Sequence, residues 1–238
     1  MIDFHYWPTP NGWKVAILLE ELGAEYRMVP VNISKGDQFA PDFLSISPNN
    51  RMPAIVDHDP PPEFGPDPVP VFESGAIMWY LAEKTGRFLP ADRRLRKEAM
   101  EWCFWQVGGQ GPMAGQLSHF VNYAPEAERT YGQKRYAGEY DRLLAVLDHR
   151  LDGREWIVGD DYTIADKICW PCVLIAKPLG ADLAPFPHVS DWRARVKARP
   201  AVQRAVDLGK ELRRKAPPDE AERRLLFEQS SAHLKHRE

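Results

Sequence analysis

A short polar turn near the N-terminus carries the first side chains that could do chemistry. The stretch PTPNG, residues 8–12, follows an alternating segment and precedes a long helical pattern. A helix N-terminus presents free N–H groups and the positive end of the helix dipole, which favour an anionic ligand. Thr9 and Asn11 add a hydroxyl and an amide at this junction. The turn is either a plain strand-to-helix connection or the place where a ligand meets the helix.

A proline at the start of a strand marks a second candidate site. In RMPAIVD, residues 51–57, Pro53 follows Met52. An X-Pro bond is ordinarily trans. In a thioredoxin-like fold, however, the proline before the third strand is typically cis, and the preceding residue then offers its N–H and C=O to an extended peptide. On that fold we expect Met52 to provide such a pair.

The stretch FESGAI, residues 72–77, predicts a third site at the start of another helix. Ser74 can cap that helix, which by itself explains a serine there. A free helix N-terminus also binds a carboxylate, and the neighbouring Glu73 can accept an ammonium group. Together with Met52, this pair matches a ligand that has a free α-amino acid end and an extended peptide body.

The stretch CWPC raises the alternative of a dithiol redox site at Cys169 and Cys172. A reactive cysteine of that kind lies at a helix N-terminus, where the dipole stabilises the thiolate. Cys169 instead lies six residues inside a helical pattern that begins at Thr163, among large apolar side chains. We therefore interpret both cysteines as core residues.

Three further patterns are interpreted as structural. YTIAD has the spacing of a capping box, with Thr163 and Asp166 bonding each other's main chain. GGQGPMAG, residues 108–115, resembles a dinucleotide fingerprint but follows a helical stretch instead of a strand, so we expect a helix break. The seven histidines show no metal-ligand spacing, and we expect no metal site.

The composition narrows the class of partner. Among 238 residues, 31 basic and 34 acidic side chains leave a net charge of -3, so no global field attracts nucleic acid or an anionic membrane. No apolar run reaches the ~20 residues of a membrane span. Three cysteines are too few for a secreted disulfide framework. We expect a cytoplasmic protein with small-molecule or protein partners.

Two domains follow from the hydrophobic periodicity. The first 86 residues alternate strand and helix patterns in the order βαβ-αββα, which predicts a thioredoxin-like, four-stranded mixed sheet. The proline-rich residues 59–68 form the enlarged tip of a hairpin. The predicted strands are 2–7, 26–31, 54–57 and 69–72, and the helices lie before Gly23, over 42–46 and from Ser74 to Gly86.

After a linker at residues 87–92, only helical patterns remain. They predict an all-α C-terminal domain over residues 93–215 and an extension over residues 216–238. The extension opens with two prolines and offers Leu225, Leu226 and Phe227 to an added helix. The helices expected in the domain are 93–107, 126–151, 163–177, 188–198 and 200–214.

Read together, these motifs resemble one known superfamily over residues 1 to about 210. TPNG, SPNNRMPAIVD, FESGAIMWYLAEKTG and DDYTIADKICWP are similar to the cytosolic glutathione transferases. Within that superfamily, they are most similar to the bacterial Nu class, which is related to the Ure2-like branch and includes glutathione-dependent disulfide-bond reductases. The resemblance implies a homodimer that binds glutathione or glutathione disulfide.

The resemblance also implies roles for particular residues. Asn11 and Thr9 lie where the family activates the glutathione sulfur, and the family's redox position there holds no cysteine. Arg135 resembles an arginine that reaches glutathione bound by the neighbouring subunit. The expected glutathione-binding residues are Asn11, Gln38, Met52 with Pro53, Glu73, Ser74 and Arg135.

The expected activity is disulfide reduction by bound glutathione, with weak conjugation or peroxidase activity beside it. Without a protein cysteine at the site, the thiolate of one glutathione attacks the disulfide and a second glutathione resolves the mixed disulfide. Two alternatives stay open at this point. One is a glutathione-binding regulatory protein with little catalysis, and the other is a dithiol oxidoreductase that uses Cys169 and Cys172.

Overall fold

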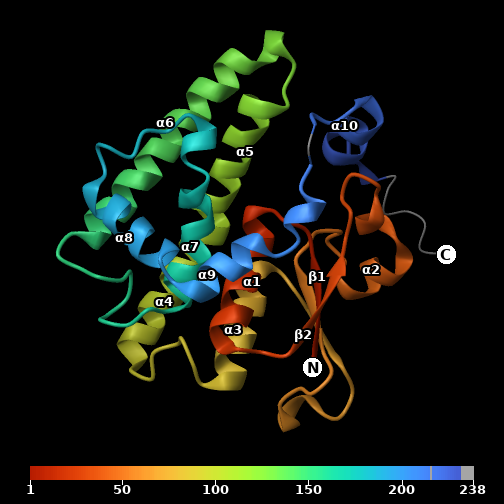
Figure 1. Cartoon of the computed structure of the whole chain (residues 1–238), viewed down its shortest axis with the longest axis vertical. Coiled ribbons are helices and arrows are strands. Elements are labelled where there is room, and N and C mark those ends of the chain that lie inside the picture. Colours follow the sequence, from red (N-terminus) through yellow and green to blue (C-terminus); the bar gives the residue numbers. More distant parts are fainter. Residues whose placement is uncertain (215, 232–238) are drawn as a thin grey trace. The chain divides into compact units, whose positions relative to one another are not determined.

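The computed structural model describes residues 1–214 and 216–231, and the chain forms two compact units (Figure 1). One unit contains Met1–Tyr80 and the described part of Arg204–Glu238, and the other contains Leu81–Gln203. The domain boundaries expected at residues 86 and 215 stay predictions. The predicted extension is described only up to residue 231, so residues 232–238 lie outside the described residues.

The first unit is built on a four-stranded mixed sheet with the strand order β2-β1-β3-β4. β1 pairs in parallel with β2, whereas β3 pairs antiparallel with both β1 and β4. This topology confirms the thioredoxin-like sheet that the sequence predicts. The strands are β1 (Ile2–Tyr6), β2 (Tyr26–Pro30), β3 (Ala54–Asp57) and β4 (Val69–Phe72).

The helices of this unit connect the strands as the topology requires. A parallel pair needs a crossover, and α1 (Pro10–Leu22) supplies it between β1 and β2. The helix ends at Gly23, whose φ of 64° belongs to the left-handed region that glycine tolerates. Further along the chain lie the 3-10 turns η1 (Asp37–Phe39) and η2 (Pro62–Phe64), and the helices α2 (Pro41–Ile46) and α3 (Ser74–Thr85).

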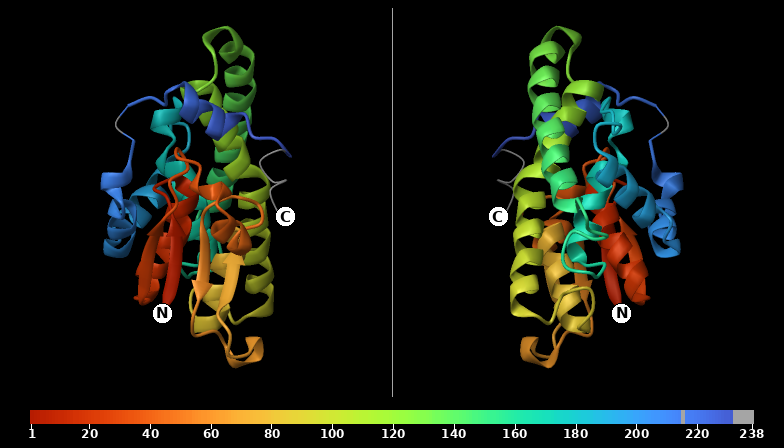
Figure 2. Two further views of the ribbon diagram at one scale, coloured as in Figure 1. Left: turned by 90° about the vertical axis from the view of Figure 1, so that its right-hand side faces the viewer. Right: turned by 90° about the vertical axis from the view of Figure 1, so that its left-hand side faces the viewer.

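The regular secondary structure of the second unit, as far as the structure describes it, consists of helices without a strand, which confirms the all-α prediction. Two of its helices, α5 and α6, run side by side as a hairpin (Figure 2). Tyr140, Leu143, Leu144 and Leu147 form the buried face of α6. The elements are α4 (Arg93–Trp105), α5 (Gly111–Asn122), α6 (Glu126–Leu151), α7 (Ile164–Leu174), η4 (Lys177–Leu179) and α8 (Pro187–Lys197), and α9 (Pro200–Asp207) begins in this unit.

The expected helix break at GGQGPMAG is wrong. The chain passes from α4 through a π-helical turn, η3 (Gln106–Gln110), directly into α5, so its backbone stays helical. Pro112, which has no N–H to donate, lies in the first turn of α5, directly after the π-helical turn. Glycine and proline therefore mark a change of helical pitch here, and the helix α5 was missed.

The α7 helix forms the centre of the second unit. Each side chain from Ile164 to Val173 is buried, and Cys169 and Cys172 are among them. Tyr140 Oη donates to the carbonyl oxygen of Cys172 at 2.7 Å, and burial raises the pKa of that phenol. This environment agrees with the interpretation of CWPC as a core segment.

The capping box at the start of α7 is confirmed. The Thr163 side chain accepts from the helix's first turn, and Asp166 Oδ2 accepts the Thr163 N–H at 2.9 Å. The other carboxylate oxygen accepts the Ile157 N–H at 3.0 Å and the Trp192 indole N–H at 2.9 Å. One buried carboxylate thereby ties three segments of the unit together.

The chain after α9 returns to the first unit. The expected helix over residues 200–214 ends at Asp207, because Gly209 adopts a φ of 60° before the 3-10 turn η5 (Lys210–Leu212). Tyr6 Oη donates to the Leu208 carbonyl at 3.1 Å, which attaches this segment to β1. The predicted C-terminal helix is present as α10 (Glu220–Phe227).

Candidate active site

The N-terminus of α1 forms one end of the site. Thr9 caps the helix, since its Oγ1 accepts the Gly12 N–H at 3.3 Å and its carbonyl accepts the Trp13 N–H at 2.9 Å. Asn11 lies between Thr9 and Gly12 in the first turn. Within the described residues, neither its main-chain N–H nor its side-chain amide has a hydrogen-bond partner. The first turn of α1 therefore offers two unpartnered donors to a ligand, and both belong to Asn11.

Glycine is required immediately after Asn11. A Cβ atom at Gly12 would lie 2.4 Å from the Trp7 carbonyl oxygen and 2.7 Å from the Tyr6 ring. Only a residue without a side chain lets the first turn of α1 approach the end of β1 this closely. The TPNG stretch thus fixes where the helix N-terminus, and with it Asn11, stands relative to the sheet.

The loop before β3 forms the next part of the site. The Met52-Pro53 bond is cis, as the sequence predicts. No hydrogen bond joins the Met52 main chain to another described residue, so its N–H and C=O are available to a ligand. The Thr9 hydroxyl lies 3.6 Å from Met52 Sδ, a weak acceptor that holds this hydroxyl only loosely.

Glu73 and Ser74 lie at the start of α3. The Ile77 N–H bonds to the Glu73 carbonyl at 2.9 Å, which makes Ser74 the first residue inside the helix instead of its cap. Glu73 has a φ of 70°, and its carboxylate accepts the Asn49 amide at 3.1 Å. Among the described residues, the Ser74 N–H and hydroxyl have no partner. An unpartnered N–H and a carboxylate thus stand side by side.

Gln38 is a buried polar side chain in this region. It is 2 % exposed, and its amide nitrogen donates to the Ile33 carbonyl at 3.2 Å. Its amide oxygen is buried with no partner in the described part of the chain. An orphaned buried acceptor is costly, and a ligand N–H would satisfy it.

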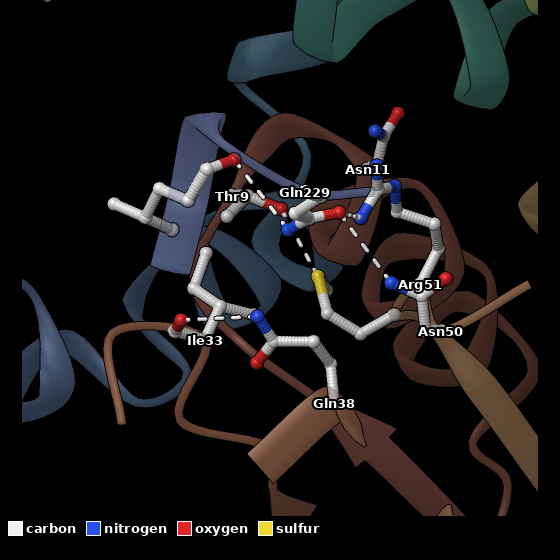
Figure 3. Close-up of a pocket in the computed structure, with 9 residues that line it drawn as sticks. Thr9, Asn11, Ile33, Gln38, Asn50, Arg51 and Gln229 are labelled. Atoms are coloured by element: carbon white, nitrogen blue, oxygen red, sulfur yellow. Dashed lines mark hydrogen bonds between the residues drawn. The ribbon is translucent and has the colours of Figure 1, made fainter. Parts of the chain in front are cut away.

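These elements surround a cavity of about 230 Å³ in the first unit (Figure 3). It brings together four residues predicted from the sequence: Thr9, Asn11, Gln38 and Met52. The sequence analysis did not predict the other lining residues. Arg51 could have been predicted, because it directly precedes Met52 in the same motif. The residues not expected to line it are Ile33, Asn50, Arg51, Leu226 and Gln229.

The other predicted site residues do not line this cavity. Pro53, Glu73 and Ser74 belong to the same unit but lie outside the lining set. Arg135 is an exposed residue of α6 in the second unit, where its Nη1 lies 3.9 Å from Glu139 Oε2. Its predicted contact with a ligand of a neighbouring subunit stays a prediction.

Of the described residues that line the cavity, Arg51 alone is charged. Its carbonyl accepts the Ser47 hydroxyl at 2.8 Å, which holds the loop, while its side chain remains exposed. Among the described residues, no group of histidine, cysteine, aspartate and glutamate could hold a metal ion. Nor does any described helix have the length and apolarity needed to cross a membrane. The cavity is thus a neutral-to-basic pocket with amide donors and acceptors.

A thioredoxin-like unit followed by a helical unit, with this pocket at the N-terminus of α1, defines a class of protein. The glutathione S-transferase N-terminal domain matches residues 1–83, and the glutathione S-transferase C-terminal domain matches residues 117–200. The chain therefore belongs to the glutathione S-transferase superfamily, as its motifs indicate.

Similar proteins refine this placement. The chain is 48% identical over 206 residues to the disulfide-bond oxidoreductase YfcG of Escherichia coli, covering 87% of this chain and 94% of YfcG. It is 43% identical over 209 residues to the disulfide-bond oxidoreductase YghU of the same species, covering 82% and 70%. A glutathione transferase from Burkholderia graminis, solved with two glutathione molecules bound per subunit, superposes with a TM-score of 0.82 at 43% identity, covering 88% of each chain.

Proposed function

We propose that the protein is a glutathione-dependent disulfide-bond reductase whose reactive sulfur belongs to bound glutathione. The observation that carries the proposal is the pocket itself. It lies at the N-terminus of α1, is lined by the unpartnered donors of Asn11, and has no cysteine in its lining. The similarity to two named disulfide-bond oxidoreductases supports the same reaction.

Asn11 and Thr9 are proposed to stabilise the glutathione thiolate. A free thiol of this type has a pKa near ~8.5, so only a few per cent is ionised at neutral pH. Each donor to a thiolate contributes about 1.5–3 kcal/mol, and lowering the pKa by one requires ~1.4 kcal/mol. The Asn11 donors, with the helix dipole behind them, are sufficient to make the thiolate predominant.

The remaining residues are proposed to hold the peptide body. The Met52 main chain, positioned by Pro53, pairs with the cysteinyl part as a strand would. The orphaned amide oxygen of Gln38 accepts a ligand N–H toward the glycine end. Glu73 binds the ligand's ammonium group, and Ser74 binds the carboxylate of the γ-glutamyl end.

The reaction consumes two glutathione molecules for each disulfide. The first thiolate attacks one sulfur of the substrate and forms a mixed disulfide, and the other sulfur leaves as a thiolate that takes up a proton. The second glutathione attacks the mixed disulfide, so glutathione disulfide and a second free thiol result. The Burkholderia relative binds two glutathione molecules per subunit, which supports a site that is large enough for both glutathione molecules of this reaction.

The decisive experiment removes every protein thiol. Steady-state glutathione-dependent reduction of a small synthetic disulfide is measured for the wild type and for a variant with Cys103, Cys169 and Cys172 changed to serine. We expect equal rates, because all three cysteines are buried in the helical unit. A lost rate in a folded variant would favour a dithiol oxidoreductase. Glutathione binding without turnover would favour a regulatory protein.

The assembly and location of the protein are part of the same proposal. A homodimer would allow Arg135 to reach glutathione bound by the neighbouring subunit, and a sizing column with light scattering tests this directly. A monomer at micromolar concentration would remove that role from Arg135. The cytoplasmic location stays a prediction from the cysteine content.

A further inference from the structure

The C-terminal helix α10 enters the candidate active site from outside the family's matched region. Both family matches end by residue 200, whereas Leu226 and Gln229 line the cavity together with Thr9 and Asn11. α10 lies beside the loop that precedes α2 (Figure 1), where a methyl group on Gly36 would be 3.5 Å from Leu225 Cδ2. α10 and the residues after it therefore form a wall of the pocket outside the two matched domains.

Gln229 connects that wall to the loop before Pro53. Its amide oxygen accepts from Arg51 Nη1 at 2.5 Å and from Asn50 Nδ2 at 3.4 Å (Figure 3). Its amide nitrogen donates to the carbonyls of Leu225 at 2.9 Å and Leu226 at 3.5 Å. The Gln229 amide nitrogen thus bonds to the end of α10, and its amide oxygen bonds to the Arg51 guanidinium.

The acceptor that Gln229 offers to Arg51 is electrically neutral. No other hydrogen bond or ion pair of the Arg51 side chain occurs within the described residues. A carboxylate can accept two parallel bonds from a guanidinium and adds the attraction of an opposite charge, whereas the neutral Gln229 amide accepts a single bond from Arg51. Any ligand carboxylate that reaches Arg51 is therefore a stronger partner than Gln229.

The attachment of α10, a helix of 8 residues, buries none of its side chains fully. Its own capping box, between Asp219 and Glu222, stabilises the helix but not its position. Outside the pocket, Arg214 lies 3.2 Å from Glu222 and 2.5 Å from the Ser34 hydroxyl, so these contacts are made at the surface. Segments with few buried contacts open at low free-energy cost.

We propose that α10 and Gln229 form a built-in cover of the glutathione pocket, latched on Arg51 and opened when a ligand carboxylate takes Arg51 from Gln229. The inference rests on the proposed function, since glutathione carries a carboxylate at each end. In the closed state the latch lowers the apparent affinity by the fraction of molecules that are closed. Ligand binding is then coupled to the opening of the cover, so each favours the other.

The test measures binding of S-methylglutathione, which retains both carboxylates but has no thiol, by calorimetry. We expect Gln229→Ala to bind about five-fold more tightly than the wild type, because the latch is absent. Gln229→Glu offers Arg51 an internal carboxylate, so it binds about five-fold more weakly. Both variants lose the amide donor to the end of α10, so opposite signs separate the latch from simple unfolding of the helix.

Three further measurements complete the design. Gln203→Ala is the matched control, because that glutamine also donates to main-chain carbonyls but lies outside the pocket lining, and it leaves affinity unchanged. Arg51→Gln binds about ten-fold more weakly, and adding Gln229→Ala to it changes nothing further. Amide hydrogen exchange over Glu220–Phe227 becomes faster when S-methylglutathione saturates the wild type.

The outcomes distinguish this inference from the proposed function. Weaker or unchanged binding by Gln229→Ala, or slower exchange of α10 with ligand bound, overturns the latch while leaving glutathione binding intact. If binding and hydrogen exchange change as expected but the protein reduces no disulfide, the proposed reaction is overturned and the latch is retained. Failure of every variant to bind S-methylglutathione overturns both.

Discussion

Replacing Asn11 by alanine tests the proposed chemistry most directly. The substitution removes a side-chain amide that lines the pocket and has no other partner among the described residues. One donor to a thiolate contributes about 2 kcal/mol, so its loss raises the pKa of bound glutathione by about 1.5. For a thiol that is mostly ionised at pH 7 in the wild type, the thiolate fraction falls roughly ten-fold, and kcat/KM for disulfide reduction falls with it.

The assay follows the thiolate itself as well as the rate. The ultraviolet absorbance of bound glutathione is titrated with pH, and kcat/KM is measured over the same range. We expect the variant to regain most of the wild-type rate at about pH 9, where the thiol ionises without help. An unchanged thiol pKa in a folded Asn11→Ala variant would refute the assignment.

Asn11 is a cleaner position for this test than Thr9. The Thr9 oxygen also caps α1 through the Gly12 N–H, so Thr9→Ala costs about 1 kcal/mol of stability in addition to any chemistry. Asn122→Ala is a matched control, because within the described residues that amide donates its hydrogen bonds to Ser118, one turn earlier in α5. The control variant retains both the wild-type rate and the thiol pKa.

Other substitutions test the scaffold. Gly12→Ala places a methyl carbon 2.4 Å from a main-chain oxygen, so we expect a loss of about 3 kcal/mol in urea unfolding; an unchanged midpoint contradicts the packing argument. The Arg27 guanidinium holds the pKa of the Asp3 carboxyl below its ordinary value of 3.8, so this pair stabilises the fold above that pH, and its contribution disappears as the pH falls through the folded-state pKa. Asp3→Asn should therefore flatten the acid-side loss of stability, and superimposable curves would argue against it. Asp166→Asn removes the charge from a buried acceptor of three N–H groups, and a loss of about 3 kcal/mol in thermal unfolding is expected; an unaltered Tm would show that the charge is dispensable.

Local patterns predicted most of the elements correctly because their causes are local. The strands of the sheet and the helix at residues 126–151 follow from side-chain periodicity, which depends only on neighbours along the chain. The GGQGPMAG stretch was misread for the same reason. Glycine and proline indicate a helix end, but whether the backbone ends there or takes a π-helical turn depends on the packing around it.

The sequence by itself determined the superfamily, the mixed sheet and four lining residues of the pocket: Thr9, Asn11, Gln38 and Met52. Each is placed by a short motif that sets its own backbone. Only the tertiary structure decided that Gln229 bonds to Arg51, a residue 178 positions away, and that α10 lines the same cavity. A pairing of that kind depends on where the whole chain returns after α9, and no local spacing encodes it.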